Sequence, residues 1–107
     1  MSSYLLIASQ DPFESKSAER FLSLAERLAK EDDVFVFLVQ NGVLPARAGA
    51  SDEWLASLSR AGVTVLADEF SLKERGIAES RVADGVTPTS LDTVLDHLVA
   101  GAKVLWH

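Results

Sequence analysis

Val34-Phe35-Val36-Phe37-Leu38-Val39 is the strongest strand signal in the sequence. Every residue in this run is β-branched, aliphatic or aromatic, and no polar residue alternates with them. Such a run is typical of a strand that is buried on both faces, as in a parallel sheet. We therefore expect 34–39 to be a central strand with all of its side chains buried, including Phe35 and Phe37.

Four further short segments, before and after this strand, are predicted to be strands. They are residues 4–8, 63–67, 85–87 and 103–106. Segments with helical periodicity separate them, the clearest being 18–29, where apolar residues recur every three or four positions. Asp11, Ser15 and Ser17 are alternative caps for that helix. The alternation predicts an α/β fold: a three-layer α/β/α sandwich around a five-stranded parallel sheet.

The other helical segments are less regular. Ser51 or Asp52 can cap a helix that ends at Gly62, whereas 43–50 reads as an irregular or short helical connection. A short helix is predicted at 68–76, with Phe70 as a buried anchor. In the last helix, apolar residues recur at helical spacing and form one face, so His97 is expected at or near the polar face. The apolar face consists of Leu91, Val94, Leu95, Leu98 and Val99.

Composition narrows the possible functions. The 107 residues fit one domain, 1–107, and are 48% hydrophobic and 24% charged. Ten Lys and Arg against sixteen Asp and Glu give a net charge of −6, which argues against nucleic acid and anionic lipid as partners. No apolar run approaches the roughly 20 residues that span a bilayer. The start, Met1-Ser2-Ser3, has no signal-peptide character, so a cytoplasmic location is expected.

Residues that could carry chemistry are few. The sequence contains no cysteine, which excludes a thiolate nucleophile, a disulfide and a cysteine-ligated metal. It has no phosphate-binding glycine loop and no Gly-x-Ser-x-Gly elbow. The two histidines, His97 and His107, form no metal-ligand spacing with carboxylates. We therefore assign no catalytic residue, no metal ligand and no cofactor, and we do not expect an enzyme.

Polar residues do follow three of the predicted strands. The candidates for a binding cleft are Gln10, Asp11, Asn41, Asp68 and Glu69. In open α/β sheets, ligands sit beyond the carboxyl ends of the strands, where adjacent helix N-termini carry partial positive charge. The alternative is that these residues cap helices and complete turns. Candidates for an interface with another chain are Val43, Leu44 and Trp106, which are apolar or aromatic and sit at the ends of predicted elements or outside them.

Several segments together resemble the DsrE/DsrF/DsrH family. Residues 9–14 and 17–22 resemble the start of its DsrH/TusB members, and Val39-Gln40-Asn41-Gly42-Val43 resembles the end of their second strand. Residues 65–77, which contain Arg75-Gly76, resemble the strand, short helix and Arg-Gly signature of the wider family. A terminal strand with a tryptophan, here Trp106, is similar to that of the DsrH subgroup.

The resemblance implies a cytoplasmic role in sulfur relay, for tRNA thiolation or sulfur oxidation, by assemblies of like or unlike subunits: dimers, trimers or hexamers. Relay members carry sulfur as a cysteine persulfide. The expected cysteine positions correspond to Phe21 and to the segment 68–71, and neither holds a cysteine. The sequence therefore predicts a non-catalytic subunit or scaffold whose partner supplies the cysteine. The alternative is a small-molecule-binding protein that uses the strand-end cleft.

Overall fold

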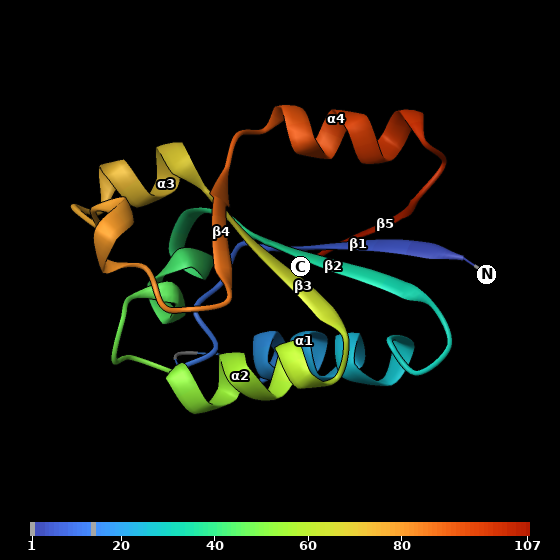
Figure 1. Cartoon of the computed structure of the whole chain (residues 1–107), viewed down its shortest axis with the longest axis horizontal. Helices are drawn as coiled ribbons and strands as arrows, with labels where there is room; N and C mark the ends of the chain where they lie inside the picture. Colours follow the sequence, from blue (N-terminus) through green and yellow to red (C-terminus); the bar gives the residue numbers. More distant parts are fainter. Residues whose placement is uncertain (1, 14) are drawn as a thin grey trace.

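The computed structural model describes residues 2–13 and 15–107, and its centre is a five-stranded sheet in which all neighbours are parallel (Figure 1). The strand order is β4-β3-β2-β1-β5. The strands are β1 (Ser3–Ala8), β2 (Asp33–Leu38), β3 (Val63–Asp68), β4 (Val86–Thr89) and β5 (Lys103–Trp106). The predicted five-stranded parallel α/β fold is confirmed.

Helices cover both faces of the sheet (Figure 1). The helices α1 (Lys16–Leu28) and α2 (Asp52–Arg60) lie side by side on one face, and α4 (Asp92–Val99) lies across the other. The short helix α3 (Glu69–Glu74) follows β3, and the 3₁₀ segments η1 (Gln40–Ala46) and η2 (Glu79–Arg81) complete the connections at this end of the sheet. Ser15 caps α1, because its side chain accepts a hydrogen bond from the backbone N–H of Ala18.

Strand β2 occupies the centre of the sheet, as its sequence predicts. Val34, Val36, Phe37 and Leu38 are fully buried. The expectation that every side chain of 34–39 is buried is wrong for Phe35 and Val39, which are only partly buried. The reason is geometric: odd-numbered residues of this strand face α4, and α4 covers that face incompletely.

The two faces of the sheet differ greatly in the size of their cores. The face toward α1 and α2 carries eighteen buried residues in one continuous cluster, among them Leu6, Leu22, Val36 and Leu58. Among the described residues, the face toward α4 carries four: Leu5, Ile7, Phe37 and Leu66. The fold is therefore held together mainly from the α1 and α2 side.

Helix α4 is turned differently from the sequence prediction. It contains no buried residue, and it meets the sheet through Val94 and through His97, whose ring packs at 4.4 Å from the Phe35 ring between centroids. His97 therefore faces the sheet and not the polar side of the helix. The remaining apolar residues of α4 and its cap are largely exposed to solvent; they are Leu91, Leu95, Leu98 and Val99, each more than half exposed. We refer to these four residues as the α4 face.

Candidate functional site

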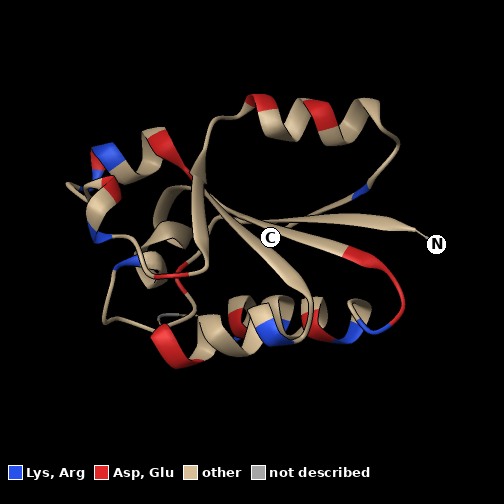
Figure 2. Ribbon diagram, viewed as in Figure 1, with Lys and Arg blue, Asp and Glu red and all other residues tan. Residues whose placement is uncertain are grey.

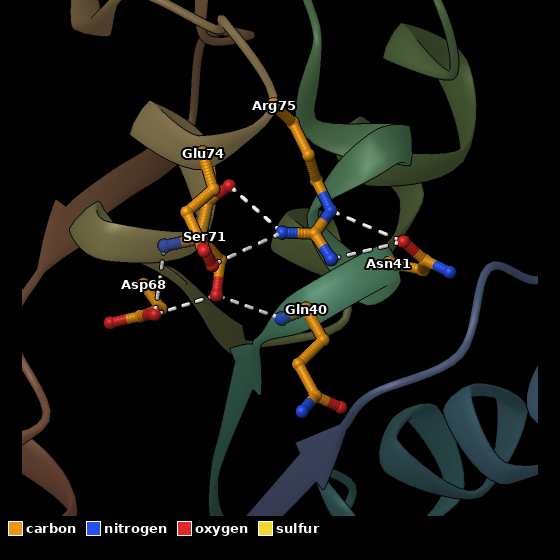
Figure 3. Close-up of polar contacts among 6 residues, drawn as sticks. All are labelled: Gln40, Asn41, Asp68, Ser71, Glu74 and Arg75. Carbon is orange, nitrogen blue, oxygen red and sulfur yellow. Dashed lines mark hydrogen bonds and ion pairs between the residues drawn. The ribbon is translucent and has the colours of Figure 1, made fainter.

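The carboxyl ends of the three central strands lie level with one another. Ala8 pairs with Leu38, and Leu38 pairs with Ala67, so the segments that follow β1, β2 and β3 begin at the same edge of the sheet. Of the five residues predicted to line a cleft there, Asn41 and Asp68 take part in one polar network with Ser71 and Arg75 (Figure 3).

Asp68 and Ser71 form the buried part of this network. Asp68 is the N-cap of α3, and its Oδ2 accepts hydrogen bonds from the backbone N–H of Ser71 at 3.0 Å and from the Ser71 hydroxyl at 2.6 Å. The Ser71 hydroxyl in turn accepts a bond from the backbone N–H of Gln40 at 2.8 Å. Asp68 and Ser71 are only 3% and 2% exposed, so this network ties α3 to the end of β2 below the surface.

The backbone at Gln40 takes a conformation that few residues adopt. Its φ is 54°, in the left-handed region, and it is the one described residue other than glycine with a positive φ. Two residues later, a side chain on Gly42 would place its Cβ 2.1 Å from the carbonyl oxygen of Ala8. The chain therefore turns sharply after β2 and presses against the end of β1, which requires a glycine at position 42.

Arg75 closes the network at its exposed side. Its Nε and Nη2 donate to the side-chain oxygen of Asn41 at 3.2 and 3.1 Å, and its Nη1 donates to the carbonyl oxygen of Ser71 at 3.2 Å. The Glu74 carboxylate lies 3.8 Å from Nη1. The Arg75 guanidinium thus bridges η1 and α3, and about a quarter of its side chain is exposed.

The other three cleft candidates do not join this network. Asp11 is buried, and its carboxylate accepts a 3.0 Å bond from the backbone N–H of Phe13, which completes a local turn. Gln10 and Glu69 are exposed to solvent. Ser71 and Arg75 were not among the sequence candidates; the hydroxyl three residues after an Asp cap was the available signal for Ser71.

The polar network around Asp68 and Ser71 stabilises the fold and provides no free nucleophile. Ser71 has a carboxylate partner at short range, as an activated nucleophile would, but its hydroxyl is buried and already engaged by both Asp68 and Gln40. Phe70, predicted as a buried anchor of α3, is 66% exposed, so that expectation is wrong. The turn of α3 is held by the Asp68 cap and the Ser71 bond to Gln40 instead.

The three interface candidates lie in different environments. Val43 is fully buried in the core beneath η1, and Leu44 is partly buried against the same core, so Val43 presents no surface to another chain. Trp106 is 69% exposed on β5 and donates a long 3.4 Å bond to the Ser9 hydroxyl. Trp106 and Val104 share the sheet face toward α4, because side chains alternate along a strand.

No helix in the described part of the chain is both long and apolar enough to cross a membrane. A sequence model of the DsrE/DsrF-like family matches residues 2–106. No curated protein matches the sequence significantly.

Three solved structures share the fold. The ychN protein from E. coli is 24% identical with a TM-score of 0.89, and both chains are covered completely. MTH1491 from Methanobacterium thermoautotrophicum, a protein of unknown function, is 16% identical with a TM-score of 0.87, again over both whole chains. BT1422 from Bacteroides thetaiotaomicron, also of unknown function, is 16% identical with a TM-score of 0.75, over 99% of this chain and 95% of that one.

Proposed function

The chain belongs to the DsrE/DsrF-like family, whose model it matches over residues 2–106, and on this premise we propose that it is a non-catalytic subunit of a sulfur-relay-type assembly. Covalent transfer of sulfane sulfur requires a thiolate, and the sequence contains no cysteine. A partner subunit then supplies the thiol, and this chain supplies shape and contact surface. The partner we propose is a cysteine-bearing member of the same family.

The observation that carries this proposal is the exposed α4 face. Leu91, Leu95 and Leu98 are 57%, 58% and 51% exposed, and Val99 is 89% exposed. Large apolar side chains gathered on one helix are uncommon on the surface of a monomer, where such patches mark contact sites. Covering them with another chain removes apolar area from water, worth roughly 25 cal/mol per Å² before the costs of association.

The α4 side of the sheet is also the side with the smaller core. Of the residues that the structure describes, four are buried in the cluster there, against eighteen in the cluster on the opposite side. A partner seated on α4 would add the second layer of packing that this face lacks, and Trp106 on the same sheet face is available at its edge.

The alternative, a small-molecule site at the strand ends, has less support. The polar atoms of Asp68, Ser71, Asn41 and Arg75 bond to one another and do not converge on an open space. Three recesses of the surface are lined by other residues, and none includes Gln10, Asp11, Asn41, Asp68 or Glu69. The strand-end residues are better explained as caps and ties.

The proposal is tested by mixing the purified protein with cysteine-bearing family members encoded by the same genome. Size-exclusion chromatography with mass measurement should show a stable complex of defined stoichiometry. The substitution Leu95→Ser should weaken that complex at least tenfold, whereas Asp96→Ser on the same helix should leave it intact. A protein that stays monomeric, or that associates only with itself, contradicts the proposal.

A further inference from the structure

A separate recess with a volume of about 460 Å³ opens between the connections that follow η1 and α3. It is lined by Arg47, Ala48, Gly76, Ile77, Ala78 and Arg81. Its volume lies in the range of small-molecule sites. Figure 2 shows basic segments in and below α3, at the end of the sheet where these connections run.

The walls of this recess are fixed to one another by backbone hydrogen bonds. Arg47 and Val82 form an isolated antiparallel bridge. On either side of it, the N–H of Ala48 donates to the carbonyl of Arg81 at 2.7 Å and the N–H of Ala83 donates to that of Ala46 at 2.8 Å. The two segments that carry the arginines are therefore held in register, and the recess exists before any ligand arrives.

The two arginines are available for a ligand. Nε of Arg47 donates to the carbonyl oxygen of Leu44 at 3.0 Å, which orients the guanidinium and leaves its terminal N–H groups free of protein partners among the described residues. Within the described part of the chain, no carboxylate lies within 4 Å of either Arg47 or Arg81. Two positive charges thus face one recess without a counterion in a chain whose net charge is −6.

The rest of the lining is apolar and small. Ile77 is 7% exposed and forms part of the floor, and Gly76 has no side chain to obstruct the rim. No acidic residue belongs to the lining. The recess therefore has two guanidinium groups, which match the geometry of phosphate and carboxylate oxygens. It also has an apolar surface on which the apolar part of a small ligand can pack.

We propose that this recess binds a small organic anion that presents a phosphate or carboxylate oxyanion to Arg47 and Arg81 and rests its apolar part on Ile77 and the neighbouring alanines. A dianion is preferred over a monoanion, because two guanidinium groups line the recess. This site is independent of the α4 face, so it can be present or absent whatever the outcome for the assembly.

The test uses phenyl phosphate, with benzoate as the monoanion and phenol as the uncharged analogue. Each is titrated at low ionic strength into the full-length protein, labelled with ¹⁵N, while the backbone amide signals are followed by NMR. Phenyl phosphate should shift the amides of Ala48 and of residues 76–78 in a saturable manner, and benzoate should bind several-fold more weakly. Phenol should cause no saturable shift at these amides, and added salt should weaken binding of the dianion.

Matched variants separate a defined site from general charge attraction. Arg81→Gln should weaken phenyl phosphate binding at least fivefold, because the backbone bonds of Arg81 remain and only its charge is lost. Arg47→Lys keeps the charge but removes the Nε bond to Leu44, and should weaken binding by a smaller factor. Arg20→Gln, an exposed site on α1, should bind as the parent protein does. Equal loss in Arg20→Gln and Arg81→Gln, equal binding of phenol, or shifts centred elsewhere would overturn the proposal.

Discussion

The hydroxyl of Ser71 donates a 2.6 Å hydrogen bond to Asp68 and accepts a 2.8 Å bond from the backbone N–H of Gln40. One buried side chain therefore completes the cap of α3 and also holds the left-handed turn after β2. Removing the hydroxyl leaves the backbone N–H of Gln40 without this acceptor, and the buried Asp68 carboxylate keeps only its bond from the backbone N–H of Ser71.

We expect Ser71→Ala to lower the free energy of unfolding by about 1–3 kcal/mol, because one donor loses its partner and a buried carboxylate loses one of its two hydrogen bonds. Urea unfolding followed by circular dichroism measures it. Ser59→Ala on the exposed side of α2 is the matched control, and its effect should stay within about 0.5 kcal/mol. Equal stability of the two variants would show that the Ser71 bonds contribute nothing.

Gly42→Ala should also destabilise the protein, for a steric reason. The new Cβ would lie 2.1 Å from the carbonyl oxygen of Ala8, and backbone atoms cannot yield as a flexible side chain can. We expect a loss of about 1–3 kcal/mol, typical of overpacking. An unchanged urea midpoint for Gly42→Ala would mean that the turn after β2 can move away from β1.

Two phenylalanines offer a direct test of the core. Phe37 is fully buried, so Phe37→Ala should cost about 3–5 kcal/mol. Phe70 is 66% exposed, and Phe70→Ala should change the free energy of unfolding by no more than about 0.5 kcal/mol. Thermal or urea unfolding of the pair checks both values. A large loss of stability in Phe70→Ala would mean that the ring is in contact with another chain or element and is not exposed.

The double variant Leu95→Ser, Val99→Ser should convert the assembly that we propose into single chains. These residues lie one turn apart on the α4 face and contribute exposed apolar surface, so the isolated chain should keep its fold. Mass measurement in solution and the far-ultraviolet circular dichroism spectrum check the two halves of this prediction. An assembly of unchanged mass would move the contact surface to another part of the molecule.

The purified protein should accept no sulfane sulfur. After incubation with a persulfide donor, the intact mass should be unchanged, because no thiolate is present to accept the sulfur atom. Phe70→Cys provides the positive control: it introduces an exposed thiol beside the buried Asp68 and Ser71, and should gain one sulfur atom per chain. A stoichiometric adduct on the parent protein would contradict the non-catalytic role.

The strands could be predicted from the sequence because a strand that is buried on both faces is a continuous run of apolar residues. The run 34–39 contains no polar residue, and it forms the centre of the sheet. The orientation of α4 could not be predicted in this way. Its apolar spacing shows that one face of the helix avoids water, but not whether the sheet or another chain covers that face.

The polar network that joins Asp68, Ser71, Gln40, Asn41 and Arg75 could also be predicted only in part. Asp68 could be predicted as polar and close to a strand end, since a cap needs only its own neighbours in sequence. The bond from Gln40 to Ser71 joins residues 31 positions apart, and that from Arg75 to Asn41 spans 34. Such pairings depend on how β2 and β3 align, which no local pattern specifies.

Because α4 is only sparsely attached to the sheet, the end of the chain should unfold locally more easily than the rest. β5 lies at the edge of the sheet and pairs only with β1, and α4 buries no residue of its own. We therefore expect the last elements of the chain to detach together while the remaining four strands keep their ladder. Amide hydrogens of α4 and β5 should exchange with solvent by this local opening, well before those of β2, and a bound partner should slow that exchange selectively.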